Sequence, residues 1–254
     1  MNALAGPVET RTISHLHPRG SFAVADHPRP HGREEIWRFT PLSRIEALLD
    51  DAPTAAARVE VEAPAGLAAA PLRPGEGPRG QVLIPVDRAA ALASQQTPAA
   101  VHIRIPPEAG VAAPIRLSIT ADEPDALVST HIVIDAKPHS RATVLLRHTG
   151  SARLLGNVEI LVGDGAELTV VTVQDWDHTA QHLGQHEARV GRDARFRHIA
   201  VSLGGDLIRL QTNVSYAGPG GQADLFGVYF ADAGQHIEHR LFVDHNHPKG
   251  TSLV

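Results

Sequence analysis

The chain contains no cysteine in its 254 residues. Disulfides, thiolate nucleophiles and cysteine-ligated zinc or iron–sulfur sites are therefore excluded within this chain. Lysine is also scarce, because Lys137 and Lys249 are the only two, so the basic charge is almost entirely arginine. Twenty-three basic and 28 acidic residues leave a net charge of −5. This balance argues against non-specific binding to nucleic acid, which needs a basic face.

Long apolar runs and aromatic residues are few as well. No uninterrupted apolar run approaches the ~20 residues that cross a bilayer, and residues 1–12 show no secretory signal pattern. We therefore expect a cytoplasmic protein with no membrane partner. Aromatic residues make up only 4% of the chain, so a core must be built from Val, Ile, Leu and Ala, which a hydrophobic content of 43% allows.

The composition and residue pattern of the sequence divide the chain into three parts. Residues 1–33 are rich in Pro, His, Gly and Arg and predict a flexible N-terminal arm, since proline removes backbone donors and fixes φ. Residues 34–114 predict a mixed helical and β region. Residues 115–254 consist of short alternating runs separated by Gly, Asp or Pro turns, and these predict a β-helix core.

Local patterns in the mixed region predict individual elements. Ser43 and Glu46 form a capping-box pattern, which predicts a helix that Pro53 ends. Asp87 stands where it would cap a second helix through residues 88–94. The strands predicted in this region are residues 58–62, 81–85 and 101–105.

An internal repeat distinguishes the last part of the chain. Segments of small, polar and apolar residues begin at Ser140, Ala166, Ala194 and Gly221, at intervals of 26, 28 and 27 residues, and a second alternating run precedes each. A near-constant period of this size is typical of stacked units, and two strands per repeat fit one turn of a β-solenoid. We therefore predict a mainly β fold, an incomplete right-handed parallel β-helix. The alternative, a β-sandwich or jelly roll, requires no such period.

Two histidine clusters are candidate metal sites. His178, His182 and His186 are spaced by four, so a helix or a strand would place them on one side, and imidazole suits zinc, copper, iron or nickel. No carboxylate accompanies them at ligand spacing, which favours a polar row. His245 and His247, with residues 236–239 upstream, could form a cupin-like metal site. A polar turn before the following proline is the favoured interpretation of that cluster.

One pair of carboxylates is a candidate for acid–base chemistry. Asp175 and Asp177 flank Trp176, and paired carboxylates can hydrolyse glycosidic bonds. A turn at the edge of a coil, with the indole covering the core, is the favoured interpretation. The glycine-rich turns at 163–165 and 218–221 lack the helix and lysine of a phosphate loop. No nucleophile motif is recognisable, so we predict no catalytic residue and no metal ligand.

Several segments, in their order along the chain, resemble the SufB/SufD family of iron–sulfur cluster assembly scaffolds. The N-terminal signature of that family is matched by Glu35-Ile36-Trp37-Arg38-Phe39-Thr40-Pro41-Leu42. Its β-helical core is matched by residues 173–176, 229–231, 236–239, 241–245 and 247–252. The resemblance runs from about residue 10 to the end. The absence of cysteine favours the SufD branch, because the role of SufB implies a cysteine that carries the cluster.

The resemblance implies a non-catalytic scaffold subunit. SufD pairs with SufB through the β-helices, and each holds one copy of the ATPase SufC through a C-terminal helical domain. The iron–sulfur cluster belongs to the complex, and we expect no cofactor bound by this chain itself. We expect the chain to be a truncated fragment that lacks the helical domain, and a homodimer is possible. No functional residue is carried over from the family.

Two other functions are kept as alternatives. A β-helical enzyme acting on polysaccharides would use Asp175, Asp177 or Glu187, which would have to cluster on one outer face. A metal-binding β-sandwich would use His236, His245 and His247.

Overall fold

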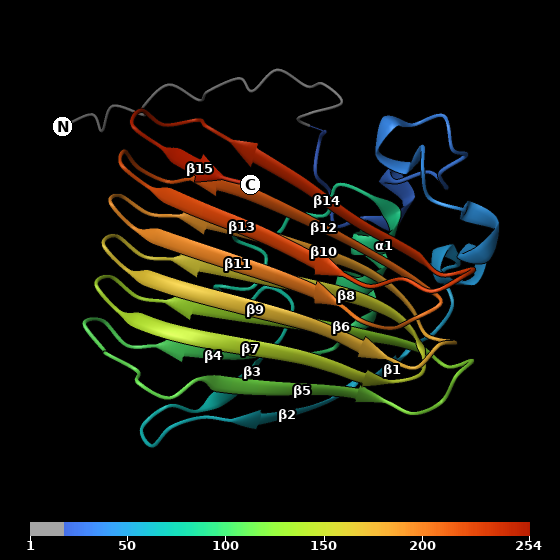
Figure 1. Cartoon of the computed structure of the whole chain (residues 1–254), viewed down its shortest axis with the longest axis horizontal. Coiled ribbons are helices and arrows are strands. Elements are labelled where there is room, and N and C mark those ends of the chain that lie inside the picture. Colours follow the sequence, from blue (N-terminus) through green and yellow to red (C-terminus); the bar gives the residue numbers. More distant parts are fainter. Residues whose placement is uncertain (1–17) are drawn as a thin grey trace.

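We analysed a computed structural model of the chain, and residues 18–254 are described. Most of these residues wind into a parallel β-solenoid of about five turns (Figure 1). The mainly β, solenoidal fold predicted from the repeat is confirmed, and the β-sandwich alternative is wrong. No helix among residues 18–254 is both long and apolar enough to cross a membrane.

Two sheets form the walls of the solenoid, and successive long strands alternate between them. Sheet A contains β3 (Ala69–Leu72), β4 (Ala100–Ile105), β6 (Leu127–Ala136), β8 (Arg153–Val162), β10 (Gln181–Val190), β12 (Leu207–Tyr216) and β14 (His236–Asp244), with β1 (Ala55–Ala56) beside β6. Sheet B contains β2 (Arg58–Glu62), β5 (Ile115–Ala121), β7 (Arg141–Gly150), β9 (Glu167–Trp176), β11 (Arg195–Ser202), β13 (Gln222–Tyr229) and β15 (Thr251–Leu253).

The register of the strands explains the repeat. In sheet B, Arg141 pairs with Glu167, Glu167 with Arg195, and Arg195 with Gln222. Each of these residues directly follows one of the four positions from which the period was read, so the predicted repeat is the rung spacing. The pairs β2–β5 and β3–β4 are antiparallel and lie at the beginning of the stack.

One corner of the solenoid repeats the same backbone conformation in every turn. A single residue there has a φ between 53° and 78°, in Glu108, His139, Gly165, Asp193, Gly220 and Lys249. The N–H of each of the first five donates to the carbonyl that precedes its counterpart in the next turn, for example from His139 to Asp164 at 2.9 Å. Side chains other than glycine rarely adopt this conformation. The hydrogen-bond ladder between turns therefore holds the corner in place.

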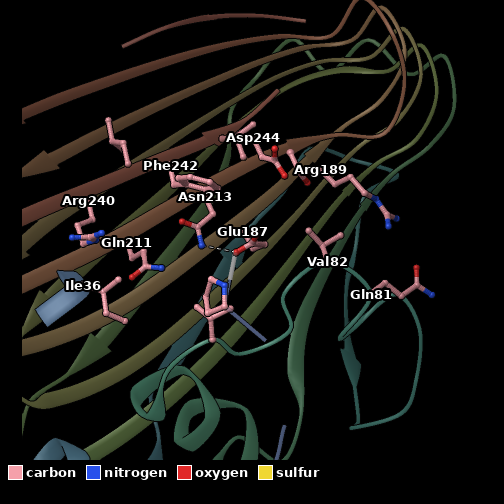
Figure 2. A pocket seen from close by; sticks show the side chains of 15 residues that line it. Ile36, Gln81, Val82, Glu187, Arg189, Gln211, Asn213, Arg240, Phe242 and Asp244 are labelled. Atoms are coloured by element: carbon pink, nitrogen blue, oxygen red, sulfur yellow. Dashed lines mark hydrogen bonds between the residues drawn. The ribbon is translucent and has the colours of Figure 1, made fainter. Parts of the chain in front are cut away.

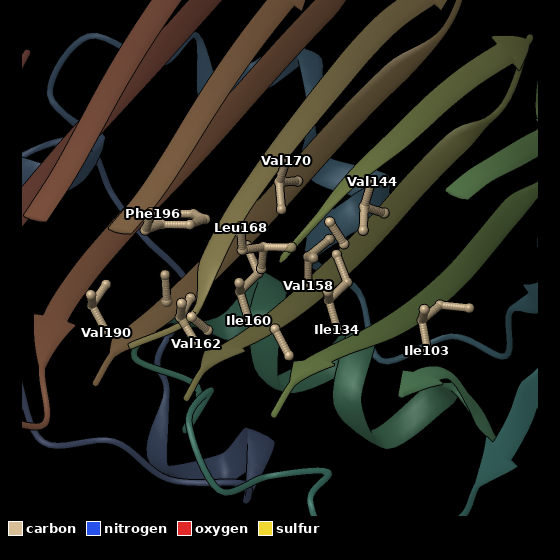
Figure 3. Packing of buried hydrophobic residues seen from close by; sticks show 14 of the residues in the cluster. Ile103, Ile134, Val144, Val158, Ile160, Val162, Leu168, Val170, Val190 and Phe196 are labelled. Atoms are coloured by element: carbon tan, nitrogen blue, oxygen red, sulfur yellow. The ribbon is translucent and has the colours of Figure 1, made fainter. Parts of the chain in front are cut away.

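The apolar half of the interior is filled by aliphatic side chains that stack from turn to turn (Figure 3). Ile134, Ile160, Ala188 and Val214 form one such column on sheet A, and all four are buried. Burying one Val, Ile or Leu side chain contributes roughly 1.5–3 kcal/mol. Because each column is only one side chain wide, few aromatic residues are needed, as the composition indicates.

The outer face of sheet A is covered by the N-terminal part of the chain. Helix α1 (Arg88–Gln96) packs its alanines against Leu155, Leu183 and Leu207. The 3₁₀ turns η1 (Val24–Asp26), η2 (Glu35–Trp37), η3 (Leu42–Arg44) and η4 (Glu46–Leu49) complete this layer. The Asp87 carboxylate accepts a hydrogen bond from the backbone N–H of Ala90 at 2.9 Å, so the predicted cap of α1 is confirmed.

Two predicted elements of the N-terminal region are wrong. The Ser43/Glu46 pattern gives η3 and η4, without a side-chain cap, in place of a capped α-helix. Tertiary contacts intervene, because the carbonyl of Arg44 accepts a hydrogen bond from the Gln181 side chain at 2.9 Å. Residues 81–85 form no strand, because the backbone N–H groups of Val82 and Leu83 donate to a buried carboxylate of sheet A.

The predicted domain boundaries stay predictions. Residues 1–17 of the expected flexible arm lie outside the described residues, and within 18–33 the side chains of Val24 and His27 are buried. Strand β4 lies upstream of residue 115 and pairs in parallel with β6. Residues from the mixed region therefore contribute to the sheets of the solenoid.

Gly150, the last residue of β7, offers a direct test of the packing between turns of the solenoid. Gly150 and Gly66 have φ values of +90° and +88°. A Cβ on Gly150 would lie 2.2 Å from the carbonyl oxygen of Ala121, whereas nothing lies within 4 Å at Gly66. We expect Gly66→Ala to lower the free energy of unfolding by about 1 kcal/mol through backbone strain alone. Gly150→Ala should cost about 2–4 kcal/mol, because steric overlap adds to the same strain. Equal losses in denaturant titrations would contradict this packing.

Candidate functional site

A polar cleft of about 400 Å³ lies where the N-terminal residues meet the outer face of β10, β12 and β14 (Figure 2). Glu187, Arg189, Asn213 and Arg240 bring both signs of charge and an amide to it, and Phe242 adds an aromatic surface. The Asn213 amide donates to Glu187 Oε2 at 2.9 Å. Charged and amide groups around an aromatic ring can bind a polar partner, but they do not form a nucleophile with its base.

Beside the cleft, a buried arginine holds the N-terminal signature against the solenoid. The Arg209 guanidinium lies 3.9 Å from the ring centre of Trp37 and donates to the carbonyl of Ile36 at 2.8 Å. Burial lowers the pKa of Arg209, while the nearby carboxylates of Asp87 and Glu238 oppose this effect. The Trp37 pattern singled out from the sequence is therefore the clamp that fixes the N-terminal segment onto β12.

A buried carboxylate organises the neighbouring loop. Glu159 accepts hydrogen bonds from the backbone N–H groups of Gly80, Val82 and Leu83 at 2.7–3.2 Å. Its other partner is the imidazole of His131, whose Nε2 lies 2.7 Å from Oε1. Burial alone would raise the pKa of Glu159, but these hydrogen bonds and His131 bring it below its ordinary value. Burial lowers the pKa of His131, so a neutral imidazole donates to an ionised Glu159.

The other part of the solenoid interior contains hydrogen-bonded polar side chains among the apolar ones. Gln174 Oε1 accepts hydrogen bonds from the Trp176 indole and from His182 Nδ1, each at 2.7 Å. Its amide nitrogen lies 3.1 Å from His148 Nδ1. Nothing in the sequence pattern distinguishes these inward positions from the aliphatic ones beside them.

Two further histidines continue this row. His186 Nδ1 lies 3.2 Å from His198 Nε2, so one ring donates to the other. Burial lowers the pKa of His148 and of His198 to about 4, and it lowers that of His182 and His186 well below the ordinary value. All four rings are therefore neutral at pH 7.

The histidines of the two candidate metal clusters are not brought together as ligand sets. His182 and His186 share the inward face of β10, as the strand spacing predicts, but His178 lies exposed in the preceding turn. His245 and His247 lie in the loop after β14, where the imidazole of His245 contacts Ser252. In the part of the chain that the structure describes, no group of three or more His, Asp or Glu side chains is placed to hold a metal.

The carboxylates considered as a candidate pair for acid–base chemistry lie apart. Asp175 forms an ion pair with Arg147 on the outer face of sheet B, and Asp177 is exposed in the turn. Glu187 lies on sheet A, so the clustering required for polysaccharide hydrolysis is absent among these three. His236 and Glu238 contact one another, whereas His239 points inward to Ser202.

Comparisons with known proteins agree with this solenoid. The family described as "SUF system FeS cluster assembly, SufBD core domain" matches residues 118–254. The chain belongs to this family. An iron–sulfur cluster assembly SufBD family protein of Mycobacterium leprae is 41% identical over 236 residues, and one of Mycobacterium tuberculosis is 39% identical over the same length. Both alignments cover 92% of this chain, which spans about 60% of the length of these relatives. Membership of the SufB/SufD family, predicted from the Trp37 signature and the core motifs, is confirmed.

The buried histidines predict a loss of stability in mild acid. An unfolded histidine takes up a proton near pH 6.5, but His148 and His198 do so only near pH 4 in the folded chain. The unfolded state therefore binds more protons between these pH values. Each of the two histidines should lower the free energy of unfolding by roughly 2 kcal/mol when the pH falls from 7.5 to 5. Denaturant titrations across this range measure the loss.

A leucine variant isolates one histidine in this experiment. His198 stacks between Val170 and Leu225, so His198→Leu fits an aliphatic column. We expect a shallower dependence of stability on pH in this variant, and no change of slope in His178→Gln, whose side chain is exposed. Identical slopes in His198→Leu and the unmodified chain would contradict the buried, neutral state of His198.

A second variant tests the buried carboxylate. We expect Glu159→Gln to lower the free energy of unfolding by about 2–4 kcal/mol, because it weakens three backbone hydrogen bonds and the contact with His131. The matched control is Glu167→Gln, which removes an exposed ion pair with Arg141 and should cost about 0–1 kcal/mol. Losses of the same size in both variants would show that Glu159 does not anchor the loop.

Proposed function

We propose that this chain is a SufD-like, non-catalytic scaffold subunit of a cytoplasmic SufBCD-type complex that assembles iron–sulfur clusters. Its partners are then a SufB-like scaffold and a SufC-like ATPase. In this role the ATPase drives rearrangement of the scaffold on which the cluster is built. The contact with the ATPase is expected through a helical domain that is not part of these 254 residues.

The observation that carries the proposal is a solenoid of the SufBD family without any cysteine. A nascent cluster is held by thiolates in most proteins, and none is available between residues 1 and 254. The interior histidines are neutral, hydrogen-bonded to one another or to Gln174, and enclosed by backbone. This chemistry supports a subunit that supplies shape and docking surfaces while its partner supplies the ligands.

Co-purification tests the assembly. We expect the full-length protein, co-expressed with the SufB-like and SufC-like proteins of the same organism, to elute with both in one complex of fixed stoichiometry. Native mass spectrometry measures the composition. Elution of the protein alone, while the other two associate with each other, would overturn the proposed subunit role.

Reconstitution tests the absence of a cluster on this chain. After anaerobic incubation of the 254-residue chain with ferrous iron and sulfide, we expect no absorbance of a bound cluster after desalting. The same treatment of the complex should give a stable cluster. A stoichiometric cluster on the chain alone would contradict the non-carrying role.

A further inference from the structure

Three neighbouring strands of sheet A present a regular grid of outward side chains to the polar cleft (Figure 2). Strands β10, β12 and β14 pair in parallel, so each outward residue stands beside its counterpart on the next strand. The rows of this grid are Gln185, Gln211 and Arg240, then Glu187, Asn213 and Phe242, then Arg189, Ser215 and Asp244. All of them except Gln185 line the cleft. Because every member but Phe242 can form hydrogen bonds through its side chain, the grid suits a polar ligand.

The carboxylates of the grid already have partners. Glu187 Oε2 accepts a hydrogen bond from the Asn213 amide at 2.9 Å and lies 3.4 Å from the Gln185 amide nitrogen. Asp244 is engaged as well. An ionised carboxylate has about four acceptor positions, so each of the two can still accept a further N–H from a ligand. The acidic groups therefore favour a ligand that carries N–H donors.

The arginines of the grid have no carboxylate partner. Arg189 and Arg240 form no ion pair with any residue in the range 18–254. One N–H of Arg240 approaches the carbonyl oxygen of Glu35 at 3.4 Å, which is a long contact. A guanidinium has five N–H donors and can bind a carboxylate through two of them at once. The unused donors at both positions favour a ligand with two anionic groups.

The spacing of the two arginines sets the length of the ligand. Figure 2 shows Arg240 and Arg189 at opposite ends of the grid, with Asn213 and Phe242 between them. They are separated by two strands and by four positions along a strand, so their Cα atoms lie roughly 16 Å apart. Side chains at positions i and i+4 of an extended peptide lie on one face, about 13 Å apart, and flexible glutamate and arginine side chains bridge the difference. A small dianion with adjacent carboxylates is too short to reach both ends.

We propose that the cleft binds an extended acidic peptide segment of a partner protein. Two carboxylates of the peptide, four residues apart, lie on Arg189 and Arg240, and an apolar side chain between them packs on Phe242. The peptide N–H groups suit the carboxylates of the grid, and its carbonyls suit the side-chain amides. The chain has a net charge of −5, so long-range attraction does not favour an acidic ligand and these local contacts must supply the affinity. The inference does not depend on the scaffold role proposed above.

Isothermal titration calorimetry of the full-length protein with the peptide acetyl-Glu-Ser-Val-Ser-Glu-amide tests the proposal. We expect saturable binding of one peptide per chain with a Kd below about 1 mM. Arg189→Gln and Arg240→Gln should each raise the Kd about 5-fold or more, because each removes a charge-assisted hydrogen bond. The matched control is Arg195→Gln on the outer face of sheet B, since Arg195 is exposed and lies outside the cleft. It should leave the Kd unchanged, and circular dichroism checks that all three variants are folded.

A charge exchange tests the direct contact and the direction of the peptide. We expect Arg189→Glu to abolish binding of the peptide with two glutamates, because like charges then face each other. Replacing one of those glutamates by lysine should restore binding to this variant. Rescue is expected for only one of the two lysine peptides, since the peptide lies in one direction across the grid.

Four results would overturn the proposal. The first is no saturable binding of the peptide with two separated glutamates. The second is equal binding of acetyl-Ser-Glu-Glu-Val-Ser-amide, which has the same composition but adjacent carboxylates. The third is displacement of the peptide by an equal concentration of citrate, which would show a site for small anions. The fourth is an unchanged Kd in both Arg189→Gln and Arg240→Gln.

Discussion

Hydrogen bonding between successive turns is the constraint on which this protein depends. From β4 onward, no strand makes backbone ladder hydrogen bonds with the strand that follows it in the chain, and each long strand pairs instead with strands one turn away. In-register pairing therefore requires turns of nearly equal length. The left-handed residues at the corner follow from the same requirement, because their N–H groups also bond to the next turn. Glu108 also adopts this conformation while its N–H donates to the carbonyl of Pro138, although glutamate has no special tolerance for a positive φ, so pairing between turns offsets the local cost there.

Stacking also decides which polar groups the interior can hold. A side chain that points inward meets the side chains of the turns on either side, so a polar residue needs a partner in its own or an adjacent turn. Gln174 meets this need by bonding to Trp176, His148 and His182 at once. His186 and His198 meet it with each other. Burial keeps these imidazoles neutral, which avoids the larger cost of an enclosed charge.

The sequence predicted the features that rest on periodicity and failed on those that rest on tertiary contacts. The intervals between Ser140, Ala166, Ala194 and Gly221 are equal to the number of residues in each turn of the solenoid. Residues 81–85 resemble a strand by local pattern, but two of their N–H groups donate hydrogen bonds to Glu159. This carboxylate lies 77 positions after Val82 in the chain. No local pattern records such a partner. The candidate site was missed for the same reason, because strands far apart in sequence and the N-terminal segment form the cleft together.

One interior histidine, His182, also depends on space that two neighbouring glycines leave, and the sequence alone does not show this. In the inward column of β8, β10 and β12, Leu154 and Ile208 stand above and below His182. The imidazole leans over the neighbouring column, where Gly156 and Gly184 stand. A Cβ at these glycines would lie 2.7 Å and 3.1 Å from His182 Nε2. A close-packed interior tolerates a larger ring only where an adjacent side chain is absent. The histidine and the two glycines therefore pack as one unit. Glycine usually weakens a strand because it has no side chain to pack, but here the missing side chains leave room for a buried imidazole.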